Sequence, residues 1–190
     1  MQVERLDIPD VLLLTPRRFH DDRGYFAEVY NARQYALNGV DVTFIQDNMS
    51  HSREAGTLRG LHYQRPPFAQ AKLVSVVAGR VLDVAVDARR GSPTYGRHVA
   101  QELSAERGEQ MFVPVGFLHG FLTLEPDTIV TYKVDASYSA ADDGAVRWDT
   151  PDLAIAWPLE AAPLLSARDA SAPTFGEFDT PFVYSAGAAS

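Results

Sequence analysis

Hydrophobic and polar residues alternate in short segments over most of this chain. The clearest segments are residues 71–77, 81–87 and 127–135, and turn residues separate many such segments between about residues 42 and 158. Alternation with a period of two is typical of the strands of β-sandwiches and barrels. The pattern therefore predicts an all-β fold, a double-sheet jelly roll or barrel with an enclosed pocket.

Some of these segments predict local connections and faces. Residues 71–77 and 81–87 flank an Ala-Gly-Arg sequence, which predicts a β-hairpin with Gly79 at its turn. Residues two apart in a strand share a face. One face of the first strand is then expected to carry Lys72, Val74 and Val76. One face of residues 127–135 is expected to carry Thr128, Val130, Tyr132 and Val134.

Helix is expected at only two places, so any helices are short and peripheral. Asn31 is an N-cap candidate for a helix that stops at Gly39, and Ser166 is one for a shorter helix. The last dozen residues look like a surface tail. No repeat or linker divides the chain, so we expect one domain over residues 1–190, with a jelly-roll core at about 42–158 and a C-terminal extension at about 159–190.

Length and composition fit an ordinary globular protein. A chain of 190 residues with 46% hydrophobic and 22% charged residues can form one large β domain. No apolar run approaches the roughly eighteen residues of a membrane span, and the N-terminal residues lack signal-peptide features. With zero cysteines there are no disulfides. We therefore expect a cytoplasmic protein without a membrane segment.

The charge of the chain limits its partners. A net charge of −8 argues against binding nucleic acid through a broad basic surface, although a few arginines could surround one anionic ligand. Only two of the 17 basic residues are lysines, Lys72 and Lys133. A lysine is a compact charge whose pKa shifts readily, so each of these two is a candidate for a special role.

The stretch Leu-Arg-Gly-Leu-His-Tyr-Gln places polar side chains within an apolar run. In a strand, His62 and Gln64 point one way, while Leu61 and Tyr63 point the other. Gly60 would allow another backbone to approach closely. The polar face of this strand therefore meets either water or a polar ligand inside the fold.

A second histidine lies in a motif typical of cupins. Residues 114–121 resemble the second cupin motif, in which His119 would face the pocket. Metal-binding cupins add two histidines and a glutamate from a first motif. Here His62 is followed by Gln64 where a histidine would stand, and Lys72 lies near the position of the carboxylate. Because an ammonium group repels a cation and too few donors remain, we expect no metal.

Several blocks together resemble the dTDP-4-dehydrorhamnose 3,5-epimerase family. They occur in the family's order over nearly the whole chain, which makes the resemblance specific. The blocks are residues 19–28, 46–50, 58–64, 70–74, 114–121, 131–133 and 165–169.

The resemblance implies a fold, a substrate and a reaction. It implies a metal-free cupin-type jelly roll (a double-stranded β-helix) without a cofactor, usually a homodimer. The substrate would be a dTDP-linked 4-keto-6-deoxyhexose, inverted at C3 and C5 on either side of the C4 ketone. This chemistry needs a base for an α-proton, a group that stabilises the enolate oxygen, and an acid on the opposite ring face.

The resemblance also implies roles for individual residues. His62 matches the base and Asp169 the carboxylate that orients it, Lys72 would stabilise charge on the C4 oxygen, and Tyr132 matches the proton donor. Arg23 and Arg59 match contacts to the diphosphate, and Glu28 matches a contact to the nucleobase. His119 matches a sugar-facing residue. The remaining positions that match substrate contacts are Phe26, Gln46, Asn48, Tyr138, Asp143 and Arg168.

Two of these positions depart from the family pattern. Asp143 stands where a glutamate is common, and Arg168 where a lysine is common, so their binding roles are open. Alternatives to the double epimerase also remain open at this point. They are a mono-epimerase that inverts only C3 or C5, a metal-dependent cupin oxygenase or isomerase, and a non-catalytic sugar-nucleotide-binding jelly roll.

Overall fold

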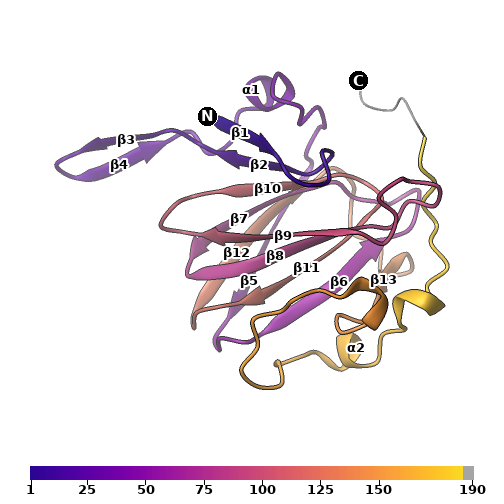
Figure 1. The fold of residues 1–190 in the computed structure, drawn as a ribbon. Helices are drawn as coiled ribbons and strands as arrows, with labels where there is room; N and C mark the ends of the chain where they lie inside the picture. The colour runs from indigo at the N-terminus through magenta and orange to yellow at the C-terminus, as the bar shows by residue number, and fades with distance from the viewer. Residues whose placement is uncertain (186–190) are drawn as a thin grey trace.

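Two antiparallel sheets packed face to face make up the body of the computed structural model, which describes residues 1–185 (Figure 1). In spatial order, the six-stranded sheet contains β1 (Gln2–Arg5), β2 (Leu12–Thr15), β10 (Gln110–Val113), β7 (Lys72–Ala78), β12 (Thr128–Val134) and β5 (Gln46–Ser52). The five-stranded sheet contains β13 (Asp143–Ala145), β6 (Leu58–Gln64), β11 (Phe117–Thr123), β8 (Arg80–Asp87) and β9 (His98–Ser104). The predicted all-β jelly roll is confirmed.

The predicted hairpin between residues 71–77 and 81–87 is wrong. Strands β7 and β8 form as expected, but β7 pairs with β10 and β12, whereas β8 pairs with β11 and β9. The chain crosses from one sheet to the other at Gly79, which has φ 75°. A Cβ atom there would lie 2.3 Å from Oγ1 of Thr128. The glycine therefore serves a tight crossover against β12 rather than a hairpin turn.

The six-stranded sheet begins earlier in the chain than the expected core range. Leu12 and Leu14 of β2 are buried against β10, together with Tyr35 of the short helix α1 (Ala32–Ala36). As predicted, Asn31 caps α1, because its side chain accepts a hydrogen bond from the backbone N–H of Gln34 at 3.2 Å.

Strands β3 (Arg18–Asp21) and β4 (Gly24–Ala27) form a separate two-stranded hairpin that projects beyond the sheets (Figure 1). It carries exposed aromatic side chains, and 71% of Phe26 is accessible. Arg18 anchors its base by donating a hydrogen bond of 2.8 Å to the carbonyl of Ala105. The hairpin is therefore fixed to the body at one end only.

The space between the sheets holds the central core, and the C-terminal segment covers the outer face of the five-stranded sheet. That segment includes η1 (Pro151–Leu153), α2 (Ala167–Ala170), which begins after Ser166 as predicted, and η2 (Phe175–Glu177). Leu61 and Tyr63, on the side of β6 away from His62, pack against Phe175, Phe178 and Phe182.

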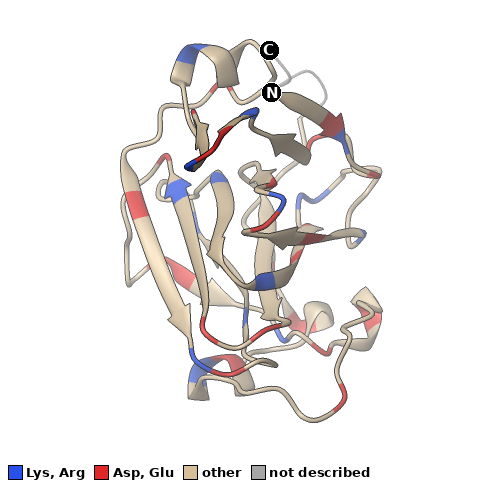
Figure 2. Cartoon of the chain, turned by 90° about the vertical axis from the view of Figure 1, so that its left-hand side faces the viewer, with Lys and Arg blue, Asp and Glu red and all other residues tan. Residues whose placement is uncertain are grey.

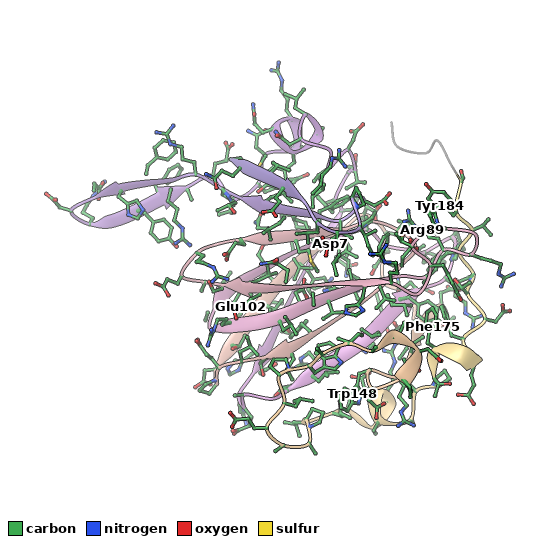
Figure 3. The ribbon with its side chains drawn as sticks, viewed as in Figure 1. Asp7, Arg89, Glu102, Trp148, Phe175 and Tyr184 are labelled. Atoms are coloured by element: carbon green, nitrogen blue, oxygen red, sulfur yellow. The ribbon has the colours of Figure 1, made fainter. Side chains whose placement is uncertain are left out.

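The prediction that the last dozen residues form a surface tail is wrong for part of that segment. Thr180 and Phe182 are both 6% exposed, and Arg90 bridges to Val183. The Arg89 guanidinium lies 5.1 Å from the ring centre of Tyr184 (Figure 3). Apolar burial and this cation–π contact hold the segment on the body. The rest of the predicted tail, residues 186–190, lies outside the described residues.

Charged residues are spread over the molecule rather than gathered on one side. Figure 2 shows Lys and Arg interspersed with Asp and Glu along strands and loops. Among residues 1–185, no helix has the length and apolar character needed to cross a membrane.

Candidate active site

Two adjoining hollows between the sheets form one site, which we call the inter-sheet cavity. Their volumes are about 260 Å³ and about 200 Å³, and they share lining residues from both sheets and from α2. The shared residues are His62, Lys72, Tyr132 and Arg168. Three of the four predicted catalytic residues therefore line both hollows: His62, Lys72 and Tyr132. The fourth, Asp169, lines one of them.

A β-bulge in β6 aims the polar side chains of this strand into the cavity. Arg59 lies opposite Phe121 and His62 opposite His119, so β6 has one more residue than β11 over this interval. A Cβ atom on Gly60 would lie 2.6 Å from the Cα of Gly120, so the close approach expected at Gly60 is present. The extra residue allows Arg59 and His62, three positions apart, to line the same hollow.

His62 and Asp169 form a hydrogen-bonded pair at one end of the cavity. Nε2 of His62 lies 2.6 Å from Oδ1 of Asp169. Asp169 is brought there by α2, whose N-cap Ser166 accepts a hydrogen bond from the Asp169 backbone N–H at 3.1 Å. Burial opposes ionisation of Asp169, but hydrogen bonds and the charge of His62 outweigh it and lower the pKa of this carboxyl. The carboxylate therefore fixes the ring and leaves Nδ1 of His62 for a ligand.

Lys72 and Tyr132 enter the cavity from the opposite sheet. They lie on neighbouring strands β7 and β12, and Nζ of Lys72 is 5.8 Å from the ring centre of Tyr132. Neither polar group has a hydrogen-bond or ion-pair partner within the described part of the chain. Burial lowers the pKa of Lys72 to about 8 and raises that of Tyr132. At neutral pH the cavity thus contains an ammonium group and a protonated phenol, both free to donate.

A second histidine–carboxylate pair lies beside the first. His119 stands opposite His62 in the strand register, and its Nε2 lies 2.7 Å from Oδ1 of Asp83 on β8. The sequence does not mark Asp83 as a site residue, because Asp83 lies in an ordinary alternating strand, Val-Leu-Asp-Val-Ala-Val-Asp. Nor does it mark Ser50, whose buried hydroxyl lines the cavity without a partner among residues 1–185.

The predicted substrate-binding residues fall into two groups. Those that line the inter-sheet cavity are Gln46, Asn48, Arg59, His119, Tyr138, Asp143 and Arg168. The other three belong to the β3–β4 hairpin and the residue just after it, and they are not among the lining residues: Arg23, Phe26 and Glu28. Arg23 instead pairs with Asp21 of the same hairpin at 2.6 Å.

The two positions that depart from the family pattern contact each other. The two terminal nitrogens of the Arg168 guanidinium, Nη1 and Nη2, donate to the Asp143 carboxylate at 2.6 and 2.9 Å. Tyr138 also donates to Asp143, at 3.2 Å. Asp143, shorter than the usual glutamate, and Arg168, with a forked guanidinium in place of the usual ammonium, thus form a bidentate ion pair at the rim of the cavity.

The side chain of Gln64 has a structural role. Its amide nitrogen donates to the carbonyls of Phe68 and Ser137, and its oxygen accepts from the backbone N–H of Ser139. It is therefore occupied in holding two loops. The described residues contain no group of three or more His, Cys, Asp or Glu side chains arranged to hold a metal ion, and the absence of a metal in the working protein stays a prediction.

Comparison with known proteins connects this geometry with a family. Residues 5–177 match the family model described as dTDP-4-dehydrorhamnose 3,5-epimerase. The chain is 49% identical over 184 residues to a protein of that name from Sinorhizobium fredii, covering 97% of this chain and 94% of the relative.

Solved structures with bound ligands have the same fold. A dTDP-4-dehydrorhamnose 3,5-epimerase from Bacillus anthracis, with TDP and PPi bound, is 48% identical with a TM-score of 0.89, covering 91% of this chain and 98% of that one. A dTDP-6-deoxy-D-glucose-3,5-epimerase from Legionella pneumophila, in complex with dTDP-4-keto-L-rhamnose, is 39% identical with a TM-score of 0.92, covering 97% and 99%.

A likeness of lower identity bears on the mono-epimerase alternative. A 3′-monoepimerase from Streptomyces bikiniensis, in complex with dTDP-quinovose, is 37% identical with a TM-score of 0.84, covering 90% of this chain and 86% of that one. Its identity is lower than the 48–49% shared with the two 3,5-epimerases from Sinorhizobium fredii and Bacillus anthracis, and close to the 39% shared with the one from Legionella pneumophila. Because the matching model spans residues 5–177 and close to half of all aligned residues are identical, the chain belongs to the dTDP-4-dehydrorhamnose 3,5-epimerase family.

Proposed function

We propose that the protein converts dTDP-4-dehydro-6-deoxy-D-glucose into dTDP-4-dehydro-L-rhamnose by inverting C3 and C5, without a metal or other cofactor. The observation that carries this proposal is the inter-sheet cavity, where an oriented histidine and a free phenol enter from opposite sheets. A ring bound between the sheets would meet a base on one face and an acid on the other. Inversion requires this arrangement.

His62 is the proposed base. Nδ1 takes the α-proton of C3 or C5, the C–H electron pair becomes the enolate double bond, and the carbonyl pair moves onto the C4 oxygen. Asp169, at 2.6 Å from the other ring nitrogen, stabilises the resulting imidazolium.

Lys72 is proposed to stabilise the enolate oxygen. It is a cation without a partner among the described residues, and it lines both hollows of the cavity. Because burial desolvates Lys72, its fixed positive charge near the developing oxyanion is worth more than it would be in bulk water.

Tyr132 is proposed to return a proton to the opposite face of the same carbon. Burial keeps its pKa above the ordinary value, so the phenol is protonated at neutral pH. The tyrosinate and imidazolium that result then exchange protons with solvent, which restores both groups for the second centre.

We also propose that the protein is a homodimer in which the β3–β4 hairpin of one copy reaches the cavity of the other. The predicted substrate contacts Arg23, Phe26 and Glu28 do not line their own cavity, and Phe26 is 71% exposed. At the hairpin base is a groove of about 560 Å³, lined in part by the exposed apolar side chains of Met49 and Val77. A second copy would cover this apolar surface.

Subunit mixing tests the dimer. His62→Ala and Arg23→Ala homodimers should both be impaired at low substrate, but a mixed dimer has one site with both residues intact. Since half of the dimers are mixed after exchange, about a quarter of the wild-type activity should return. If no activity returns and light scattering of the wild type gives a monomer, the arrangement is refuted.

The cytoplasmic location of the protein stays a prediction.

Hydrogen exchange tests the reaction itself. The 4-keto-6-deoxyglucose nucleotide is incubated with the protein in deuterated water, followed by NMR, and trapped with a reductase that forms the rhamnose product. Deuterium at both C3 and C5 together with the rhamnose product supports the double epimerase. Exchange and inversion at one carbon alone would identify a mono-epimerase, and binding without exchange a non-catalytic protein.

A further inference from the structure

Asp83 is a buried carboxylate that the proposed reaction does not use. It is 0% exposed, and one oxygen contacts Nε2 of His119 at 2.7 Å. Its other oxygen, Oδ2, is buried and has no partner among residues 1–185. Burying a carboxylate with one oxygen unpaired is costly, and an apolar side chain would fill this position between the sheets at lower cost. The residue therefore has a role other than packing.

The pairing with Asp83 decides which nitrogen of His119 carries the proton. An ionised carboxylate only accepts, so Nε2 of His119 is the donor and carries its hydrogen. Burial lowers the pKa of His119, opposed by Asp83, with the nearby charges of Lys72 and His62 lowering it further. The ring is therefore neutral at pH 7, and Nδ1 keeps its lone pair.

Nδ1 of His119 is then a hydrogen-bond acceptor in a part of the cavity where most neighbouring side chains are hydrogen-bond donors. It lines the inter-sheet cavity beside Lys72 and Arg59, and those two side chains can only donate. Nδ1 of His119 accepts no hydrogen bond within the described part of the chain. A ligand that fills the cavity must supply a donor there, since otherwise a buried acceptor stays unpaired.

We propose that Asp83 is a positioning residue that holds His119 as a hydrogen-bond acceptor for the C2 hydroxyl of the sugar, so that the site selects hexoses that carry this hydroxyl. This inference rests on the proposed function. The C4 ketone and the C6 methyl group offer no donor. The C3 hydroxyl changes faces when C3 is inverted, whereas the C2 hydroxyl keeps its place. A rigid acceptor suits the hydroxyl that does not move.

The first test uses only the wild-type protein. Turnover of the 4-keto-6-deoxyglucose nucleotide is compared with that of its 2-deoxy analogue. Loss of one buried hydrogen bond should lower kcat/KM for the analogue roughly 10- to 100-fold. Equal kcat/KM values for the two sugars would overturn the inference and leave the proposed function intact, whereas no turnover of either sugar would refute the proposed function.

The second test examines the tautomer. In protein labelled with ¹⁵N-histidine, the His119 resonances are assigned by their loss in His119→Gln. The wild type should show a protonated Nε2 and an unprotonated Nδ1. A protonated Nδ1 would contradict the proposal directly, whatever the kinetics.

The third test uses Asp83→Asn with Asp169→Asn as its matched control. An asparagine can donate to Nε2, which permits the tautomer with a hydrogen on Nδ1. KM for the natural sugar should then rise about tenfold or more with a smaller change in kcat, because the C2 contact exists in both ground and transition states. The preference over the 2-deoxy sugar should also shrink, whereas Asp169→Asn should lower kcat and keep that preference. An Asp83→Asn protein that keeps the full preference would exclude Asp83 from this role.

Discussion

The two histidine–carboxylate pairs of the inter-sheet cavity have similar distances but different surroundings. Nε2 of His62 lies 2.6 Å from Asp169, and Nε2 of His119 lies 2.7 Å from Asp83. The side chain of His62 is 30% exposed, whereas that of His119 is 6% exposed. The first pair joins a strand to a helix from the C-terminal segment, and the second joins two neighbouring strands of one sheet.

This difference indicates how one motif serves two purposes. A base must exchange protons with substrate and solvent, so partial exposure suits His62. A group that only accepts a hydrogen bond has to keep one protonation state, and full burial between strands provides that for His119. Similar local geometry therefore does not imply the same chemistry, because burial and neighbouring charges decide it.

Removing each histidine should give the largest contrast. His62→Ala should lower the rate of deuterium exchange at both C3 and C5 by about 10²–10⁴, with nucleotide affinity within a few fold, because the base is lost. His119→Ala should mainly raise KM. The check is NMR exchange with a binding isotherm for each variant. If exchange at either carbon survives His62→Ala at near the wild-type rate, His62 is not the shared base.

Tyr132→Phe should separate exchange from inversion. The ring and its packing remain, so the fold should survive and the enolate should still form. His62 could then return a solvent-derived proton to its own face, which gives deuterium in recovered, uninverted sugar. We expect exchange to exceed inversion, whereas His62→Ala loses both together. A variant that inverts both centres as well as the wild type would assign the acid to another group or to water.

The pH dependence of kcat/KM should report the ionisation of Lys72, which lines the same cavity as both histidines. Its pKa is about 8, and its charged form is the acid form. kcat/KM should therefore fall as pH rises through about 8, roughly tenfold per unit once the lysine is neutral. Tyr132 titrates higher, because burial raises its pKa from 10.0. A profile that stays flat from pH 7 to 9.5 would show that the charge of Lys72 is not needed.

Lys72→Met should stabilise the fold while it removes activity. The folded-state pKa is lowered from 10.5 to about 8, so the buried charge costs stability at pH below 8. As pH rises from about 8 to 10.5, the unfolded chain binds more protons than the folded one, stability rises, and the gain from the substitution fades. We expect a gain of about 1–2 kcal/mol at pH 7 in urea unfolding. If Lys72→Met lowers the free energy of unfolding at pH 7, or if its gain does not fade by pH 10.5, then burying the charge of Lys72 does not cost stability.

Much of the site followed from short motifs in the sequence. The Leu-His-Tyr-Gln strand, the Pro-Val-Gly-Phe-Leu-His segment and the Ser-Ala-Arg-Asp helix start were sufficient to name His62, His119 and Asp169. The face shared by Thr128, Val130 and Tyr132 was also correct, because a strand's alternation is a local property. Asp83 was missed because nothing in its own strand distinguishes it from a surface acid.

The sequence by itself determined the strand alternation, the helix caps and the family, because these depend on side chains close together in the chain. The tertiary structure decided which strands pair. The crossover at Gly79 sends β7 and β8 into different sheets, although their short connection suggests a hairpin. It also decided that His62 and Tyr132 face each other across the cavity, and that Asp83 lies behind His119. Such placements depend on packing and hydrogen bonding between residues far apart in the chain. The pattern of hydrophobic and polar residues within one strand therefore does not predict them.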